Sequence, residues 1–287
     1  MSQRPKRVLV VWNERKPDVR ARIDALADWF AERCEIHAIA PAAGPLPAEA
    51  QDVEFCVVFG GDGTLLSAAR MLSGTAIPLL GVNMGKLGFL ADFSLEHFQK
   101  HFDEILDGQI SPTDRLMLDV SVTNCVVHGF CSAVANDVAI SAGAPFRMID
   151  LRVEQGGVQI ARYLGDGLIV STPTGSTAYN MSAGGPIMAP TLEAVAITPI
   201  APHTLSMRPI VVGADEPICI TATSVNEGTT LIVDGQRPSG LCSGDQIEVA
   251  RAAAPLRIIP HPRRAFFDTL TDKLQWGRSP HHLDRDG

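Results

Sequence analysis

Asp62 is the one acidic residue in a glycine-rich run, Gly60-Gly61-Asp62-Gly63-Thr64, which follows an apolar stretch and precedes an apolar helical pattern. Three glycines within four positions allow the backbone to turn sharply and to approach a ligand closely. The start of the following helix offers free amides to an anion. The run therefore predicts a phosphate-binding turn whose carboxylate can accept a proton. On local grounds, an ordinary Gly-Asp-Gly turn with a helix cap is an equal alternative.

A second segment with binding chemistry runs from Gly165 to Pro186 and is rich in small and hydroxyl-bearing residues. Seven of the twelve residues from 171 to 182 carry a hydroxyl: Ser171, Thr172, Thr174, Ser176, Thr177, Tyr179 and Ser182. Hydroxyls and free backbone amides suit phosphate and ribose oxygens. A Ser/Thr-rich surface loop is the alternative, but apolar residues border the segment on both sides, which favours a binding site.

Two shorter motifs combine an amide with a carboxylate. Asn136-Asp137 could pair with a base edge and hold two ribose hydroxyls, although such a pair alone is more typical of a turn or a cap. Asp234-Gly235-Gln236 has the composition of a β-hairpin turn.

The first part of the chain predicts alternating strands and helices, which must position Asp62. The expected strands are Val8–Trp12, Cys34–Ile39, Phe55–Phe59 and Ile77–Val82, and the expected helices are Val19–Arg33 and Leu95–Leu106. This alternation predicts a doubly wound, Rossmann-like parallel sheet that binds ligands at the carboxyl ends of its strands. Asp62 follows such a strand end.

After Gly108 the pattern changes to period two, which is typical of antiparallel strands. The expected strands are Leu116–Thr123, Ile149–Glu154, Val158–Arg162, Leu168–Ser171, Ile218–Ala222, Thr230–Val233 and Ile247–Val249, with a possible helix at Thr191–Ala196. Near the end, Phe267, Leu270 and Leu274 share one helix face. We therefore predict an α/β domain at 1–108, an all-β domain at 109–258, and a helical tail at 259–287 that returns to the first domain.

The composition limits the partners of this 287-residue chain. With 24 Lys and Arg against 32 Asp and Glu, the net charge of −8 argues against binding a nucleic acid or an anionic membrane by bulk charge. No apolar stretch reaches the length of a membrane span, and no signal peptide precedes the first strand. Four of the six cysteines lie in apolar strand-like runs, which favours buried thiols in a reducing cytoplasm. Because the net charge is negative, any phosphate site must be built locally from backbone amides, a few cations or a metal.

Taken together, the motifs resemble those of NAD kinases, and they occur in the same order. The resemblance rests on Gly60-Gly61-Asp62-Gly63-Thr64, on Asn83-x-Gly85-x-Leu87-Gly88-Phe89-Leu90, on Asn136-Asp137, on the Asp166–Pro186 block and on Asp234-Gly235-Gln236. The ending Phe266-Phe267-Asp268-Thr269-Leu270 is also similar. Diacylglycerol-type lipid kinases share the first motif alone, whereas the run from Thr172 to Tyr179 is far more specific.

This resemblance implies an enzyme that transfers the γ-phosphate of ATP to the 2′-hydroxyl of the adenosine ribose of NAD, which yields NADP. Asp62 would be the general base, Gly63 would let the substrate lie against the turn, and Asn136 with Asp137 would hold adenine and ribose. The other residues that the resemblance places around NAD are Arg147, Leu164, Asp166, Thr174, Thr177, Ala178, Tyr179, Asn180, Met181, Ser182 and Gln236. Mg²⁺ would arrive with ATP, without a metal site made wholly by protein, and the chain would form a homodimer or homotetramer.

Leu164 departs from the pattern, because some bacterial members carry arginine at this position. The choice between NAD and NADH is therefore left open, as is the choice between ATP and polyphosphate as donor. A diacylglycerol-type lipid kinase and a non-catalytic dinucleotide sensor are the two alternative functions. Retention of Asp62 argues against the sensor.

Overall fold

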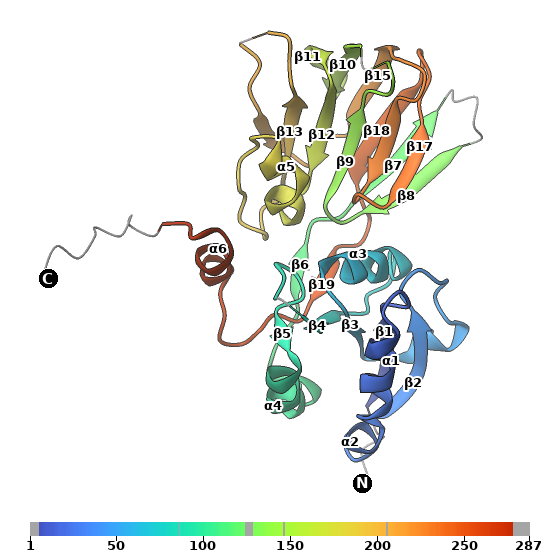
Figure 1. The fold of residues 1–287 in the computed structure, drawn as a ribbon, viewed down its shortest axis with the longest axis vertical. Helices are drawn as coiled ribbons and strands as arrows, with labels where there is room; N and C mark the ends of the chain where they lie inside the picture. The colour runs from blue at the N-terminus through green and yellow to red at the C-terminus, as the bar shows by residue number, and fades with distance from the viewer. Residues whose placement is uncertain (1–5, 86, 124–128, 146, 205, 278–287) are drawn as a thin grey trace, which may run out of the picture.

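The computed structural model describes residues 6–85, 87–123, 129–145, 147–204 and 206–277. Figure 1 shows two domains stacked along the long axis, with the C-terminal helix to one side of the region where they meet. The lower domain mixes helices with a parallel sheet, and the upper domain consists mainly of antiparallel strands. This is the α/β plus all-β architecture that the sequence predicts.

The α/β domain is built on a sheet with the strand order β2-β1-β3-β4-β19-β6, in which β5 also pairs with β4. Its strands are β1 (Arg7–Trp12), β2 (Glu35–Pro41), β3 (Phe55–Phe59), β4 (Leu79–Asn83), β5 (Phe93–Ser94), β6 (Thr113–Arg115) and β19 (Leu256–Ile258). Its helices are α1 (Pro17–Asp24), α2 (Ala27–Ala31), η1 (Ala48–Asp52), α3 (Asp62–Met71) and α4 (Leu95–Leu106). All neighbouring pairs are parallel except β6 with β19.

Strand β3 forms the middle of this sheet because all five of its side chains are apolar and buried. An aromatic cluster that includes Phe30, Phe98 and Phe102 packs on one face, with ring centroids 5.0 to 6.1 Å apart. Ser94 caps the start of helix α4, because its hydroxyl accepts the His97 N–H at 3.1 Å. The predicted helix at Val19–Arg33 is divided into α1 and α2, because Leu26 leaves helical geometry at φ −93° and ψ 2°.

The β domain consists of two antiparallel sheets whose inner faces form one apolar core. One sheet contains β7 (Leu118–Thr123), β8 (Phe130–Val134), β10 (Ile149–Gln155), β11 (Val158–Gly165), β15 (Ile218–Ser224) and β18 (Gln246–Arg251). The other contains β9 (Asp137–Ser141), β12 (Gly167–Ser171), β13 (Ala194–Ile200), β14 (Ile210–Gly213), β16 (Thr230–Val233) and β17 (Arg237–Gly240). Two short helices, η2 (Thr174–Thr177) and α5 (Tyr179–Ser182), follow β12.

The predicted helix at Thr191–Ala196 is wrong, because the chain there enters strand β13. This strand pairs with β12 on one side and with β14 on the other, and the side chains from Val195 to Pro199 are buried. A residue run buried on both faces favours a central strand over a surface helix.

The chain crosses between the domains twice, at neighbouring places. It leaves the first sheet after β6 and enters the β domain at β7, and it returns from β18 to β19. The two crossings lie side by side, since β6 pairs with β19 and β7 pairs with β18. The strands Thr113–Arg115 and Leu256–Ile258 therefore belong to the sheet of the α/β domain.

Helix α6 (Phe266–Leu274) confirms the helix predicted near the end of the chain. Its Leu270 is buried, whereas Phe267 is 59% exposed. The Lys273 ammonium lies 4.8 Å from the centroid of the Phe89 ring, so the helix contacts the α/β domain. No helix in the described part of the chain is long and apolar enough to cross a membrane.

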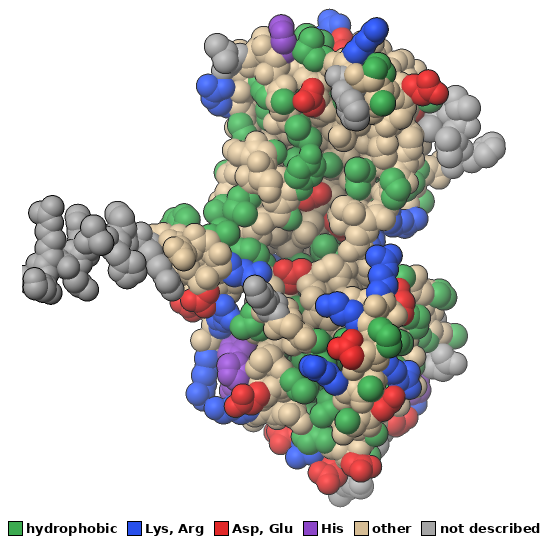
Figure 2. All heavy atoms as spheres, in the orientation of Figure 1, with side chains coloured by type: hydrophobic (Ala, Val, Ile, Leu, Met, Phe, Trp, Pro, Cys, Tyr) green, Lys and Arg blue, Asp and Glu red, His purple; other side chains and the backbone are tan. Residues whose placement is uncertain are grey.

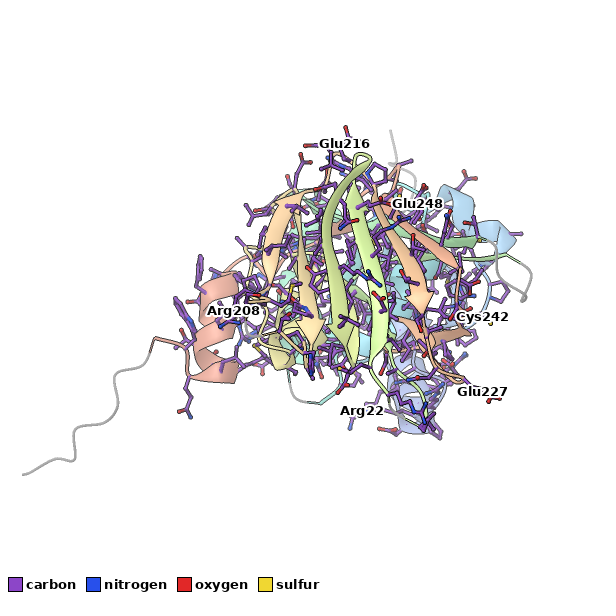
Figure 3. All side chains as sticks on the ribbon, turned by 90° about the horizontal axis from the view of Figure 1, so that it is seen from above. Arg22, Arg208, Glu216, Glu227, Cys242 and Glu248 are labelled. Carbon is purple, nitrogen blue, oxygen red and sulfur yellow. The ribbon has the colours of Figure 1, made fainter. Side chains whose placement is uncertain are left out.

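The cysteines only partly follow the expectation of buried thiols. Cys34 and Cys56 are buried, but Cys131 and Cys242 are exposed. Cys131 lies on the outward face of β8, where side chains alternate in and out. Figure 3, which looks down on the β domain, shows Cys242 at its outer surface and α6 on the side of Arg208. Cys125 lies outside the described residues.

Candidate functional site

Asp62 is the first residue of α3, and its side chain is tied to the segment 88–91. Its Oδ2 accepts the Phe89 N–H at 2.8 Å, and its Oδ1 accepts the N–H groups of Leu90 and Ala91 at 3.1 and 3.0 Å. Gly88 leaves the space for this arrangement, because a Cβ there would lie 1.8 Å from Oδ1. A carboxylate has about four lone-pair positions, so one position on Oδ2 stays open to accept a proton.

A cavity of about 850 Å³ opens beside the same turn, between the two domains. Gly61, Gly63 and Thr64 line it, and the start of α3 carries no side-chain cap. Four cationic side chains also line the cavity: Arg15, Lys16, Arg70 and Arg237. Free helix amides and local cations together favour a polyphosphate, despite the net negative charge of the chain. On the face drawn in Figure 2, Lys and Arg side chains lie along the narrow waist between the domains.

A smaller cavity, of about 210 Å³, is lined in part by the 88–91 segment. Its lining includes Phe89 and Leu90 from the α/β domain, Thr174 and Thr177 from the β domain, and Phe266 from α6. Asp62 itself lines neither cavity, but it connects their walls: its chain neighbours Gly61 and Gly63 line the larger cavity, and its hydrogen-bond donors Phe89 and Leu90 line the smaller one. The wall is mixed, because charged and hydroxyl-bearing side chains alternate with Phe89, Leu90 and Phe266, and such a wall can bind both a ring and polar groups.

Three buried oxygens at or near this smaller cavity have no hydrogen-bond partner within the described residues: Asp92 Oδ1, Asn136 Oδ1 and Thr174 Oγ1. Buried polar atoms normally have a partner, so a ligand donor is a natural complement. Asp92, Arg115 and Arg264 add charge to the wall. Burial raises the pKa of Asp92 to about 6, so this carboxyl is partly neutral near pH 6.

Two hydroxyls of the segment after β12 bond to the chain itself. Thr172 Oγ1 donates to the Ala135 carbonyl at 2.6 Å, and Ser176 Oγ donates to the Pro173 carbonyl at 2.7 Å. Gly175 brings this segment against the backbone of Asn136, since a Cβ there would lie 2.2 Å from the Asn136 carbonyl oxygen. The hydroxyls therefore mainly fix the position of Thr174 relative to Asn136.

Asn180 is fully buried, and its amide is used within the chain. Its Nδ2 donates to the Ser176 and Pro186 carbonyls, and its Oδ1 accepts the Thr198 hydroxyl at 2.6 Å. Asn180 therefore supports the segment from inside. Its neighbours Ala178 and Met181 are half-buried, while Tyr179 and Ser182 are exposed.

Three predicted site residues lie away from Asp62. Leu164 and Asp166 precede β12, whereas Thr172 follows it, so the length of the strand separates the two groups. Leu164 is 43% exposed, and Asp166 is exposed as well. Arg147 lies on the exposed loop that follows β9. Asn136, Asp137 and Thr174 thus lie near one end of β12, while these three lie at its other end.

The Asp234-Gly235-Gln236 motif forms the predicted hairpin turn between β16 and β17. Asp234 and Gly235 both have positive φ, 49° and 65°, as a type I′ turn requires. Gln236 Nε2 donates to the Gly63 carbonyl at 2.9 Å, so this side chain lies at the larger cavity.

Asp137 begins β9, and its carboxyl is only 4% exposed. Burial and the nearby charge of Asp234 raise the pKa of Asp137 to about 7. A raised pKa means that the fold favours the neutral carboxyl. Its stabilising contribution is present at acid pH and is lost as the pH rises through about 7.

The Asp137→Asn variant should therefore gain thermal stability relative to the wild type as the pH rises. We expect the difference in Tm, variant minus wild type, to be more positive at about pH 8 than at about pH 5, by roughly 3 °C. Calorimetry at the two pH values measures it. Asp150→Asn is the control: a hydrogen bond from Arg162 lowers the pKa of Asp150, so this carboxylate stays ionised at both pH values and its Tm difference should be the same at each. A Tm difference that is the same at both pH values would contradict the raised pKa of Asp137.

Comparisons with known proteins agree with this geometry. Residues 8–110 match the ATP-NAD kinase N-terminal domain, and residues 135–261 match the ATP-NAD kinase C-terminal domain. The NAD kinase of Geobacter sulfurreducens is 44% identical over 224 residues, covering 78% of this chain and 79% of that protein. The NAD kinase of Acidobacterium capsulatum is 35% identical over 283 residues, covering 95% of this chain and 99% of that protein.

Two solved structures share the fold. Yeast NADH kinase complexed with NADH has a TM-score of 0.81 and 26% identity, and the match covers 98% of this chain and 91% of the yeast chain. An NAD kinase from Archaeoglobus fulgidus in complex with ATP has a TM-score of 0.74 and 28% identity, and the match covers 94% of this chain and 98% of the archaeal chain. Two family models match the two domains, the related sequences align over most of their length, and the fold is shared. The chain therefore belongs to the NAD kinase family.

Proposed function

We propose that this member of the NAD kinase family uses Asp62 to accept the proton of the 2′-hydroxyl on the adenosine ribose of NAD as that oxygen attacks the γ-phosphorus of ATP. The new bond joins the ribose oxygen to phosphorus, the bond to the bridging oxygen breaks, and ADP leaves. The observation that supports this role best is that Asp62 connects the two cavities: its chain neighbours Gly61 and Gly63 line one, and its hydrogen-bond donors Phe89 and Leu90 line the other. A carboxylate is a weak base at neutral pH, so it helps mainly in the transition state, when the hydroxyl becomes acidic.

The larger cavity suits the donor. Its volume of about 850 Å³ and its four cationic side chains favour the triphosphate, and the amides at the start of α3 lie beside the position of transfer. The smaller cavity, together with Asn136 and Asp137, suits the adenosine half of NAD. Unpartnered Asn136 Oδ1 can accept from the adenine amino group, and the Asp137 carboxylate can accept from ribose hydroxyls.

A divalent metal fits this arrangement as a companion of ATP. Mg²⁺ takes most of its ligands from phosphates and water, with one or two carboxylates at most. Within the described residues no cluster of three His, Cys, Asp or Glu could hold a metal, and Glu14 is the acidic residue in the lining of the larger cavity. When bound, the ion would neutralise charge that develops on the phosphates.

An activity assay tests the proposal. Purified protein is incubated with ATP, Mg²⁺ and either NAD or NADH, and NADP and NADPH are quantified separately. We expect NADP formation with ATP; failure to form either product would contradict the proposal. The ratio of the two products reports the substrate choice that Leu164 leaves open, and polyphosphate replaces ATP in a parallel reaction.

Tyr179→Ala should weaken the binding of NAD. Tyr179 belongs to the hydroxyl-rich segment and is 44% exposed, so its aromatic ring can contact the dinucleotide. We expect the Kd for NAD to rise roughly 10-fold, measured by isothermal calorimetry without ATP. Tyr179→Phe, which keeps the ring, is the matched control and should bind nearly as the wild type does. Unchanged affinity in the alanine variant would remove this segment from the pocket.

The remaining expectations about partners stay predictions. Light scattering or analytical ultracentrifugation tests whether the chain forms the homodimer or homotetramer that the resemblance implies. The contacts with NAD predicted for Arg147, Leu164 and Asp166 also stay predictions. These residues lie at the end of β12 opposite Thr172.

A further inference from the structure

We infer that Arg70 is a positioning residue that holds the NAD-binding edge of the β domain at a fixed distance from Asp62. The inference rests on the proposed function, since it assigns Asn136 and Asp137 to the dinucleotide. Arg70 projects from α3, the helix that begins with Asp62. It forms an ion pair with Asp234, which belongs to the β domain.

The central contact is a buried ion pair between the domains. Arg70 Nη1 donates to Asp234 Oδ2 at 2.6 Å, and the side chains are 11% and 0% exposed. Such a pair is typical of a geometric constraint more than of net stability, because removing both charges from water is costly. The pair therefore fixes where the hairpin turn sits against α3.

The same carboxylate also holds the start of β9. Asp234 Oδ1 accepts the N–H of Asn136 at 2.7 Å, and longer bonds reach the N–H groups of Ala135 and Asp137 at 3.2 and 3.3 Å. A continuous series of contacts thus runs from α3 through Arg70 and Asp234 to Asn136 and Asp137. These are the residues proposed to hold adenine and ribose.

Gln236 completes this connection, which we call the interdomain latch and define as Arg70, Asp234 and Gln236. Its Nε2 donates to the Gly63 carbonyl, and its Oε1 accepts from Arg70 and from the Ser67 hydroxyl at 2.8 Å. The latch therefore joins the β domain to the turn that carries Asp62 at two separate points. Four contacts in all run from Asp234 and Gln236 to residues of α3.

Rate depends steeply on such positioning. A misplacement of about 1 Å between reacting groups can lower the rate about 10²-fold. Loosening the latch should therefore reduce kcat with NAD. Where the latch is loosened at Asp234, KM for ATP should stay unchanged, because all four cationic side chains of the donor cavity are kept.

Arg70 also lines the donor cavity, so a direct contact with ATP is the competing explanation for any loss. Asp234 separates the two, because its side chain is fully buried and does not line that cavity. Direct contact predicts that Arg70→Met raises KM for ATP while Asp234→Asn does not affect the rate. The latch predicts that both variants lower kcat alike.

The experiment compares Arg70→Met, Asp234→Asn, the double variant and Arg70→Lys by steady-state kinetics in both substrates, with folding checked by circular dichroism. We expect each single variant to lose about 10²-fold in kcat, and the double variant to lose no more than either single one, as for residues that act together. Arg70→Lys should recover part of the loss. Arg251→Met is the control, because its partner Glu193 is exposed and lies outside both cavities.

Losses that multiply in the double variant, or a change confined to KM for ATP, would overturn the inference. Hydrogen exchange at the Ala135, Asn136 and Asp137 amides gives a readout independent of turnover, and it should accelerate in Arg70→Met. If the wild type itself makes no NADP, the proposed function fails, while the exchange measurement still tests the latch. Unchanged exchange in a folded Arg70→Met protein would contradict the latch directly.

Discussion

The Asp62→Asn variant should lose NADP formation by about 10²–10⁴-fold, which is the usual contribution of a general base. The amide cannot accept the proton of the 2′-hydroxyl, although it retains the size of the carboxylate. NAD binding should change little, because the adenosine contacts proposed at Asn136 and Asp137 stay in place. Single-turnover assays measure the rate, and calorimetry measures the affinity.

Asp24→Asn is a suitable control for Asp62→Asn. Asp24 is an exposed carboxylate on α1 that pairs with Arg20 at 2.9 Å, so its replacement should leave turnover unchanged. Near-full turnover in Asp62→Asn would show that another group, or water, accepts the proton. The assignment of Asp62 as the base would then be wrong.

Gly88→Ala should also cause a large loss of turnover, although this residue carries no side chain of its own. A methyl group there would meet Asp62 Oδ1 at 1.8 Å, so the 88–91 segment or the carboxylate must move. Either movement breaks the hydrogen bonds from Phe89, Leu90 and Ala91 that orient Asp62. We expect kcat to fall about 10²-fold, as measured with saturating ATP and NAD.

Gly85→Ala provides the matched control in the same loop. Its added methyl group would find nothing closer than Asn83 Oδ1 at 3.8 Å, and neither glycine has a positive φ. The substitution should therefore keep most of the activity. Equal losses in both variants would mean that the whole loop is sensitive, and that the contact between Gly88 and Asp62 is not special.

Local sequence patterns predict the elements whose residues carry strong periodicity. Strand Phe55–Phe59, helix Leu95–Leu106 and strand Thr230–Val233 form with the predicted bounds. Strand β9 was not expected, because Asn136 and Asp137 among small residues suggest a turn. In the fold their backbone amides bond to Asp234, which lies about a hundred positions later, so no local pattern could indicate a strand there.

The candidate site is likewise only partly predictable from the sequence. Glycine spacing around Asp62 and the hydroxyl-rich run after β12 are visible in the sequence, because close backbone approach restricts residue type. The pairing of Arg70 with Asp234 has no such signal, since an arginine on a helix is ordinarily a solvated side chain. The cationic lining from Arg15 and Lys16 is likewise set by the packing of the two domains.

The neighbouring crossings between the domains make the β domain an insertion with both of its ends at one place. Leu118 pairs with Arg251 where that domain begins and ends, and Arg115 pairs with Leu256 on the other side. Residues 118–251 could thus be expressed as a separate polypeptide, and a short linker could close the gap left between 115 and 256. The half with Asp62 and the half with Asn136 could then be titrated with nucleotides individually, before activity is restored by mixing them.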